Sequence, residues 1–303
     1  MSISVHNISK SYKDFKAIEA ISFDVNEGEL FGLIGPDGAG KTTIFRILTT
    51  LLLPNEGMAN VAGFDVVKEY KSIRNSVSYM PGKFSLYQDL SVEENLQFFA
   101  TIFGTTIEEN YDLIHDIYIQ IEPFKKRRAG ALSGGMKQKL ALCCALIHKP
   151  KVLFLDEPTT GVDPVSRKEF WEMLKRLQQK GITILVSTPY MDEAALCDRI
   201  ALIQKGKIFE IDSPKNIISK YSKTIYAISA KNTHQLLHDL KAYPSQYSVF
   251  AFGEFIHYID QKNNFNSADL QHYLESKNHT EIEIHIATPT IEDVFMDLTA
   301  LEH

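Results

Sequence analysis

Alternating and continuous apolar stretches along the chain predict two kinds of strand. Residues 20–25 (AISFDV) alternate between apolar and polar positions, as a half-buried strand does. Residues 28–35 and 151–156 are nearly continuous apolar runs, which are typical of strands covered on both faces of a sheet. A further apolar run begins at Ile182 and stops before Pro189. The first part of the chain therefore contains several buried strands.

Between these strands the apolar spacing changes to that of helices. From about residue 92 to 126, apolar positions recur every three or four residues, and the same spacing returns over 136–148 and 166–179. Because strands and helical crossovers follow each other, this part of the chain predicts a mainly parallel α/β sheet.

The last quarter of the chain has a different order of elements. After residue 222 the pattern gives strand, helix, two strands, helix, strand and helix. Thr288 precedes Pro289 before the last helix, as an N-cap and a first-turn residue do. This order predicts a small α+β domain of ferredoxin-like topology. We therefore divide the chain into domains at 1–221 and 222–303.

Composition and charge argue against several classes of protein, among them nucleic-acid-binding and membrane-spanning proteins. The 303 residues are 44% hydrophobic and 23% charged, as in ordinary globular proteins, and the net charge of −6 argues against binding to nucleic acid. No apolar stretch reaches the ~20 residues that a membrane span needs, and the first residues lack the apolar core of a signal peptide. Of three cysteines, Cys143 and Cys144 are adjacent, so we expect buried, reduced thiols in a cytosolic protein.

The segment GPDGAGKTT matches the phosphate-binding pattern G-x-x-x-x-G-K-[ST] between a buried strand and a helix. Its glycines let backbone N–H groups point at phosphate oxygens, and the helix N-terminus adds partial positive charge. Lys41 can reach the outer phosphates, and the hydroxyl of Thr42 can hold Mg²⁺. The predicted ATP-binding residues here are Gly35, Pro36, Asp37, Gly38, Ala39, Gly40, Lys41, Thr42 and Thr43.

Two acidic residues follow the buried strand in VLFLDEP. Asp156 alone could be a turn residue, but open α/β sheets bind ligands at the carboxyl ends of their strands. Beside a phosphate loop, Asp156 is therefore a predicted Mg²⁺ ligand. Glu157 is placed to polarise a water molecule as a general base, the alternative being a solvated charge at a helix entry.

The segment LSGGMKQKL places Ser133, Gly134 and Gly135 at the start of a helix that Ser133 caps. A hydroxyl beside exposed backbone N–H groups can bind an anion. Turns of this composition are common before helices, so this segment is weak evidence by itself.

Together these motifs, in this order, resemble the ATP-binding-cassette (ABC) ATPases over roughly residues 1–220. The ending TPTIEDVFMDLT resembles the C-terminal extension of drug-resistance and related exporter ATPases. The resemblance implies a P-loop NTPase cassette, with a mainly parallel sheet and a helical subdomain at about 83–149. It also implies ATP and Mg²⁺ as cofactors.

The resemblance implies further roles. Tyr12 matches the aromatic residue that stacks on adenine, although a plain strand residue is the alternative. Residues 160–163, ending in Asp163, match the loop that crosses between two subunits packed head to tail. In such a pair, each ATP lies between one chain's phosphate loop and the other chain's Ser-Gly-Gly segment.

Residues 83–90 (KFSLYQDL) match the region that receives the coupling helix of a membrane permease. Phe84, Leu86 and Tyr87 are expected to be exposed anchors there. The alternative is that these side chains pack inside the helical subdomain.

Two positions depart from the family pattern. Gly82 stands where members usually carry the glutamine that touches magnesium and water. Pro189 stands where they usually carry a histidine that contacts the terminal phosphate; proline offers neither a side-chain donor nor a backbone N–H. Glu157 is retained. We therefore expect a degenerate ATP site in this chain.

The leading hypothesis is the ATP-hydrolysing motor subunit of an exporter, bound to a separate membrane permease at the inner face of the cell membrane. The chain would pair with a second, fully equipped ATPase subunit or with itself. One alternative is a nucleotide-binding regulatory subunit with negligible hydrolysis. Another is a cassette ATPase that works on ribosomes or DNA, which the absence of a basic balance disfavours.

Overall fold

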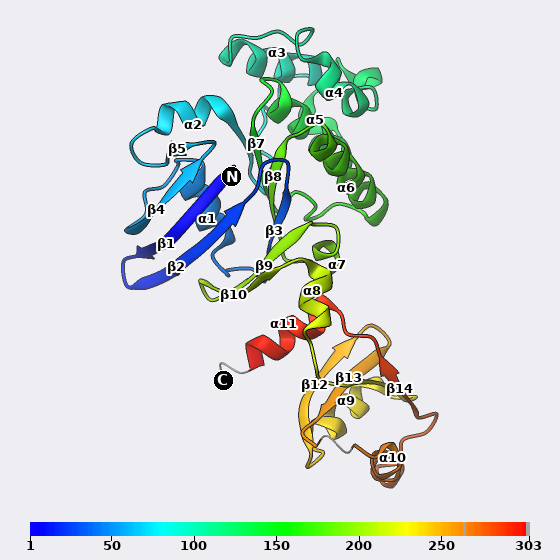
Figure 1. Cartoon of the computed structure of the whole chain (residues 1–303). Coiled ribbons are helices and arrows are strands. Elements are labelled where there is room, and N and C mark those ends of the chain that lie inside the picture. The colour runs from blue at the N-terminus through cyan, green and yellow to red at the C-terminus, as the bar shows by residue number, and fades with distance from the viewer. Residues whose placement is uncertain (263–264, 301–303) are drawn as a thin grey trace. The chain divides into compact units, whose positions relative to one another are not determined.

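The continuous apolar runs of the sequence become the central strands of a six-stranded sheet. In the computed structural model, which describes residues 1–262 and 265–300, the order is β10-β9-β3-β8-β7-β6 (Figure 1). Only β10 is antiparallel to its neighbour, and every residue of β3, β7 and β8 is buried. The strands are β3 (Leu30–Ile34), β6 (Val77–Met80), β7 (Val152–Asp156), β8 (Thr183–Thr188), β9 (Arg199–Gln204) and β10 (Lys207–Asp212).

The alternating strands belong to a separate antiparallel sheet of order β2-β1-β4-β5. These strands are β1 (Ile3–Tyr12), β2 (Phe15–Val25), β4 (Glu56–Val61) and β5 (Phe64–Asp65). The two sheets share a core with helix α1 (Lys41–Leu48), in which the Phe45 ring meets the Phe154 ring edge-on at 5.8 Å between centroids. The predicted mainly parallel sheet is confirmed, and an antiparallel sheet accompanies it.

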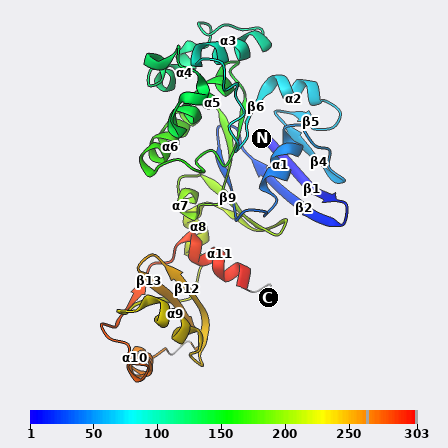
Figure 2. The same cartoon turned by 180° about the vertical axis from the view of Figure 1, so that it is seen from behind.

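The helical run predicted from about 92 to 126 is two helices and a turn. Gly104 ends the first helix with a left-handed φ of +65°, which a glycine adopts without steric cost. Helices α3, α4 and α5 lie together in both views of the chain (Figures 1 and 2). The helices of this part are α2 (Tyr70–Ser76), α3 (Val92–Ile102), α4 (Tyr111–Tyr118), α5 (Gly134–Leu146), α6 (Pro164–Gln179) and α7 (Met191–Ala194), with 3₁₀ turns at Glu122–Phe124 and Ala129–Ala131.

The chain divides into two units, Met1–Pro214 and Lys215–His303, and helix α8 (Pro214–Ser219) begins at the division. This point precedes the boundary that the sequence predicts between 221 and 222. Within the described residues, no helix combines the length and the apolar character that crossing a membrane requires.

The second unit has the sheet order β12-β13-β11-β14, antiparallel throughout. This is the ferredoxin-like order that the sequence predicts. Apolar residues of α9 and α10 pack against one face of the sheet, around Ile256 and Tyr258. The elements are β11 (Ile225–Ser229), α9 (Thr233–Lys241), β12 (Gln246–Phe252), β13 (Phe255–Asp260), α10 (Ser267–Ser276), β14 (Glu283–Ala287) and α11 (Ile291–Ala300).

The start of the last helix differs from the prediction. The helix begins at Ile291, and Thr290 caps it, because the Asp293 N–H donates to Thr290 Oγ1 at 3.3 Å. Thr288 and Pro289 lie before the cap, so their predicted roles as cap and first turn are wrong. The hydroxyl nearest the free N–H groups decides the cap, and Thr290 is nearer.

Candidate nucleotide-binding site

The carboxyl ends of the central parallel strands bring the predicted site segments to one edge of the sheet. Asp156 at the end of β7 is paired with Ser187 of β8, and Thr188 is paired with Ile34 of β3. The phosphate loop after β3 and Pro189 after β8 therefore follow neighbouring strand ends.

The phosphate loop approaches the rest of the protein so closely that two of its glycines cannot be replaced without a shift. A Cβ atom on Gly35 would lie 1.9 Å from the Ile203 carbonyl oxygen. Gly40 has a φ of +105°, and a Cβ atom there would lie 2.8 Å from the Ala17 carbonyl oxygen. Helix α1 begins at the next residue, so its free N–H groups border the loop.

Lys41 lies at the centre of this loop and is only 3% exposed. Its ammonium donates to the carbonyl oxygens of Gly35 at 2.7 Å and Pro36 at 3.0 Å. The same nitrogen lies 3.1 Å from Glu157 Oε1. The ion pair thus joins the phosphate loop to the acidic end of β7.

The backbone of Glu157 is held in an unusual conformation. Its φ is +51°, which costs free energy in a residue with a side chain. Its N–H donates to both the carbonyl oxygen and the hydroxyl of Ser187, each at 3.1 Å. The neighbouring strand therefore fixes the direction in which the carboxylate leaves the chain, toward Lys41.

Two hydroxyl groups hold the Asp156 carboxylate, which is 3% exposed. Ser187 Oγ donates to Oδ1 at 2.6 Å, and the Tyr79 hydroxyl donates to Oδ2 at 3.2 Å. Burial raises the pKa of Tyr79, and the negative charge of Asp156 raises it further, so Tyr79 stays a neutral donor. Our sequence reasoning missed both hydroxyl residues. Their signal is a polar side chain at the end of a buried strand.

The donors near the phosphate loop suit a hard divalent cation. Asp156 offers carboxylate oxygens and Thr42 a hydroxyl oxygen, the ligand types that Mg²⁺ prefers. The described residues contain no group of three or more His, Cys, Asp or Glu side chains that could hold a metal ion. Mg²⁺ bound with a nucleotide needs no such group, since phosphates and water supply most ligands. The residues therefore fit Mg²⁺ carried in with phosphates.

A hollow of about 200 Å³ adjoins the phosphate loop and includes Thr42 and Glu157 in its lining. Tyr12 and Phe15 line it too and pair across β1 and β2, with 42% and 64% of their surfaces exposed. Two exposed aromatic rings are thus available to a planar base. Phe15 was missed in the sequence, although an aromatic residue next to a predicted stacking residue is a usable signal.

The Ser-Gly-Gly segment lies in a different place. Ser133 caps α5 as predicted, accepting from the Met136 N–H at 3.4 Å. A Cβ atom on Gly135 would lie 2.7 Å from Ser166 Oγ, so this segment packs against the start of α6. Among the described residues, none of the three lines the hollow beside the phosphate loop.

Asp163 begins α6 as its N-cap, with Oδ1 accepting from the Ser166 N–H at 3.0 Å. This hydrogen bond lowers the pKa of Asp163. The cap gives the residue a local role in addition to the one that the family resemblance implies.

The two departing positions differ in their surroundings. A Cβ atom on Gly82 would lie 2.9 Å from the Asp156 carbonyl oxygen, so the backbone itself occupies the space that a side chain would need. Pro189 is half-buried and follows Thr188, whose hydroxyl donates to Glu193 at 2.6 Å.

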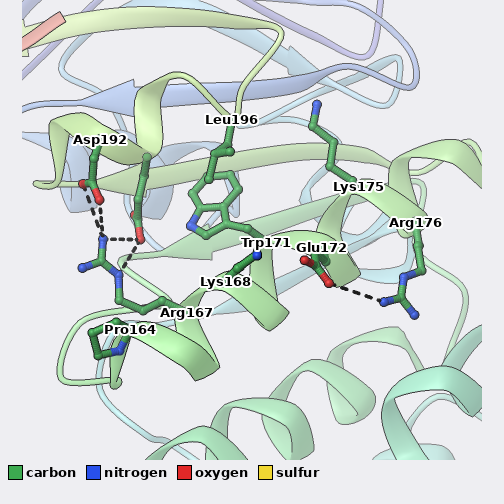
Figure 3. Close-up of a pocket in the computed structure, with 10 residues that line it drawn as sticks. Pro164, Arg167, Lys168, Trp171, Glu172, Lys175, Arg176, Asp192 and Leu196 are labelled. Carbon is green, nitrogen blue, oxygen red and sulfur yellow. Dashed lines mark hydrogen bonds and ion pairs between the residues drawn. The ribbon is translucent and has the colours of Figure 1, made fainter. Parts of the chain in front are cut away.

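Glu193 is 2% exposed and connects the segment after Pro189 with α6. It accepts from the Thr159 hydroxyl at 2.8 Å and lies 3.0 Å from the Arg167 guanidinium. Arg167 also reaches Asp192 at 3.3 Å, and Figure 3 shows the two side chains facing each other. The strand tip after β8 is thereby tied to the helix that Asp163 caps.

Beside this network lies a hollow of about 550 Å³, lined by α6 and by residues at and after α7, with Trp171 and Leu196 in its wall (Figure 3). Its lining includes neither the phosphate loop nor the acidic pair after β7. Size alone therefore does not mark the candidate site, since the predicted site residues Lys41, Thr42 and Glu157 line the smaller hollow.

In the segment 83–90, one of the residues expected to be an exposed anchor is exposed and another is buried. Tyr87 is 51% exposed and meets the Phe98 ring edge-on at 4.7 Å. Phe84 is half-buried, with the Lys137 ammonium 5.6 Å from its ring centre. Leu86 is only 9% exposed, so its expected exposure is wrong. It packs inward, as the alternative interpretation proposed.

Comparisons with known proteins agree with this geometry. Residues 18–160 match the family described as ABC transporter. The chain is 37% identical over 302 residues to the probable multidrug ABC transporter ATP-binding protein YbhF of Escherichia coli (strain K12). That match covers 98% of this chain and 52% of YbhF, so the chain spans about half the length of that relative. It is 33% identical over 306 residues to the Nod factor export ATP-binding protein I of Rhizobium sp. (strain N33), covering 100% of this chain and 98% of that protein.

Solved structures give the same result. The structure of an ATP binding subunit of an ABC transporter superposes with a TM-score of 0.66 at 26% identity, covering 73% of this chain and 93% of that one. The dimeric structure of MJ0796, a bacterial ABC transporter cassette, gives 0.63 at 25% identity, with coverage of 70% and 98%.

Proposed function

The chain belongs to the ABC transporter family of ATP-binding proteins, and we propose that it is the ATP-hydrolysing motor subunit of an exporter whose membrane permease is a separate chain. The observation that supports this most is the ion pair of 3.1 Å between Lys41 and Glu157. It brings a phosphate-binding cation and a possible general base together at the ends of parallel strands.

The proposed reaction begins with an exchange of partners. Phosphate oxygens would replace the Gly35 and Pro36 carbonyl oxygens and also the Glu157 carboxylate around the Lys41 ammonium. The displaced Glu157 carboxylate would then be free to accept a proton from water. Thr42 and Asp156 would hold Mg²⁺, which neutralises charge on the phosphates when bound. Tyr12 and Phe15 would stack on the adenine ring.

We assign Ser133, Gly134 and Gly135 to an ATP held by a partner cassette, because they lie away from this chain's own phosphate loop. Pro189 gives this chain's own site no donor for the terminal phosphate. Loss of one such donor costs about 10²–10³ in rate. The pair is then asymmetric when the partner is a fully equipped second subunit, and it has two slow sites when the partner is a second copy.

We place this pair at the inner face of the cell membrane, where ATP is available. Tyr87, exposed on the segment after β6, would contact the permease. A relative whose name includes Nod factor export supports the direction of transport.

The ATPase rate of the purified chain, beside three variants, tests the catalytic half. Glu157→Gln supplies the blank. Pro189→His is expected to raise the rate about 10²- to 10³-fold, because it restores a donor, and the matched variant Pro189→Ala is expected to leave it unchanged. Gly82→Gln is unsuitable as a companion, since its Cβ atom would meet the Asp156 carbonyl oxygen at 2.9 Å.

Two results would contradict the proposal. If the natural chain and Pro189→His both equal the blank, the chain is a nucleotide-binding subunit without hydrolysis. If Pro189→Ala accelerates as much as Pro189→His, the rigidity of proline and not a missing donor limits the rate. For the export half, affinity purification from solubilised membranes should yield a membrane-spanning partner; ribosomal particles instead would reject it.

A further inference from the structure

We propose that Tyr79 and Ser187 are positioning residues, which hold the Asp156 carboxylate in the orientation that binds the Mg²⁺ of the nucleotide. The inference rests on the proposed function and adds two residues to its metal site. Its basis is that each carboxylate oxygen accepts one hydroxyl hydrogen bond, from Ser187 at 2.6 Å and from Tyr79 at 3.2 Å.

The two hydroxyl groups come from the two strands that flank β7. Tyr79 belongs to β6, where it pairs with Phe154, and Ser187 belongs to β8, where it pairs with Asp156 itself. Because the Asp156 carboxylate accepts a hydrogen bond from each flanking strand, it cannot rotate about its side-chain bonds without breaking one of them. The sheet therefore sets the direction of the remaining lone pairs.

The kind of donor is as informative as its position. Hydroxyl groups stabilise a carboxylate without cancelling its charge, whereas a buried structural carboxylate usually has a cationic partner. Among the described residues, the Asp156 carboxylate forms these two hydrogen bonds and no ion pair. The nearby Arg46 guanidinium acts on the Tyr79 hydroxyl. The carboxylate is therefore held in place without a direct ion pair.

Gly82 explains why Tyr79 carries this task on the β6 side. The backbone after β6 approaches the Asp156 carbonyl oxygen so closely that a Cβ atom at position 82 would lie 2.9 Å from it. Glycine supplies no polar side chain there. Three residues earlier, the Tyr79 hydroxyl reaches the carboxylate, so β6 still contributes a polar group to the metal site.

The test is the affinity for ATP, measured by equilibrium dialysis with Mg²⁺ and again with EDTA. The ratio of the two affinities reports the metal site and requires no turnover. Partners of metal ligands typically contribute 10- to 100-fold to metal affinity. We expect Tyr79→Phe and Ser187→Ala each to lower the ratio about tenfold and to leave the affinity in EDTA unchanged.

Two further variants serve as controls. Ser187→Thr keeps the hydroxyl and should keep the natural ratio. Tyr118→Phe removes the hydroxyl of a buried tyrosine in α4 and should also leave the ratio unchanged.

Three outcomes overturn the inference in different ways. An unchanged ratio in both Tyr79→Phe and Ser187→Ala removes the positioning role. An equal loss of affinity with Mg²⁺ and with EDTA shows that the hydroxyl groups support the fold or the phosphate loop and not the metal. If the natural chain binds no ATP in either condition, the proposed function itself fails, and the inference fails with it.

Discussion

Each unit of the chain buries an aspartate against its sheet, and the two are held in opposite ways. Asp156 in the first unit accepts hydrogen bonds from two hydroxyl groups, and none of the ion pairs given for the described residues involves it. Asp293 in the second unit is 0% exposed and meets the His257 ring nitrogen at 2.6 Å. Its other oxygen accepts from the N–H and the hydroxyl of Thr290, at 2.7 and 2.6 Å.

We propose that the difference separates a structural carboxylate, Asp293, from the carboxylate that would bind Mg²⁺, Asp156. Asp293 is fully used: it joins α11 to β13 through His257 and completes the cap of its own helix. Asp156 is oriented by one hydroxyl hydrogen bond on each oxygen and has no direct ion pair. Asp156 and Asp293 are both buried, so burial alone does not distinguish them. Their hydrogen-bond and ion-pair partners distinguish a structural link between elements, which we call a latch, from a proposed ligand site.

The largest expected effect is on catalysis by Asp156→Asn. The amide has the same shape but lacks the charge that would bind Mg²⁺ in the proposed function. A metal contribution of several kcal/mol corresponds to about 10³-fold in rate. The midpoint of thermal unfolding should stay the same or rise, because a buried charge without a direct ion pair is removed. ATPase rates and a thermal scan of the same preparations measure both. A large fall in the unfolding midpoint would make Asp156 a structural residue like Asp293.

For Asp293→Asn we expect a loss of stability, in contrast to the loss of ATPase rate expected for Asp156→Asn. Loss of the charged hydrogen bond to His257 should destabilise the second unit by about 2–3 kcal/mol, which is about 30- to 140-fold in its opening equilibrium. Hydrogen exchange of amides in β13 and α11 measures this opening locally. Amides of β7 and β8 in the same sample provide the control and should keep their protection.

The difference in stability between the natural chain and Asp293→Asn should depend on pH, and its direction follows from the pKa of Asp293. Burial by itself raises the pKa of Asp293, but hydrogen bonds from His257 and Thr290 outweigh it, so the net pKa is lowered. A lowered folded-state pKa stabilises above the unfolded value and loses that contribution as pH falls through the folded value. The natural chain and Asp293→Asn should therefore differ fully near pH 7 and converge below about pH 4. A difference that persists at low pH would show that the ionised carboxylate is not what the latch uses.

Sequence patterns anticipated the parts of both regions that depend on short-range order. The apolar runs predicted the buried strands, and the position of Asp156 after one of them predicted its place at the sheet edge. Tyr79 and Ser187 could not be assigned to Asp156 in the same way, because their contacts require β6 and β8 to flank β7. Pairing between strands far apart in the chain leaves no periodic trace in the sequence.

The two wrong predictions have a related cause. Leu86 was expected to be exposed because its segment resembles the region that receives a permease's coupling helix, but its burial depends on side chains from elsewhere in the fold. Thr288 fits the pattern of an N-cap before proline, yet the helix starts later because Thr290 and Asp293 bond to each other. Local patterns offer several possible caps, and the reciprocal hydrogen bonds select one.

The smallest expected effect separates the contribution of the Thr290 cap from that of the His257 contact to Asp293. Thr290→Val keeps the shape of the residue and its backbone N–H but removes the hydroxyl that caps α11 and donates to Asp293. Loss of an N-cap typically costs about 1 kcal/mol, at most half of what we expect for Asp293→Asn. Hydrogen exchange of α11 should therefore accelerate about fivefold, with β13 less affected. Acceleration in both elements equal to that in Asp293→Asn would mean that the cap and not the histidine holds the carboxylate. The comparison with Asp156 would then rest on hydroxyl donors in both units, and the distinction between latch and ligand site would have to come from the cation alone.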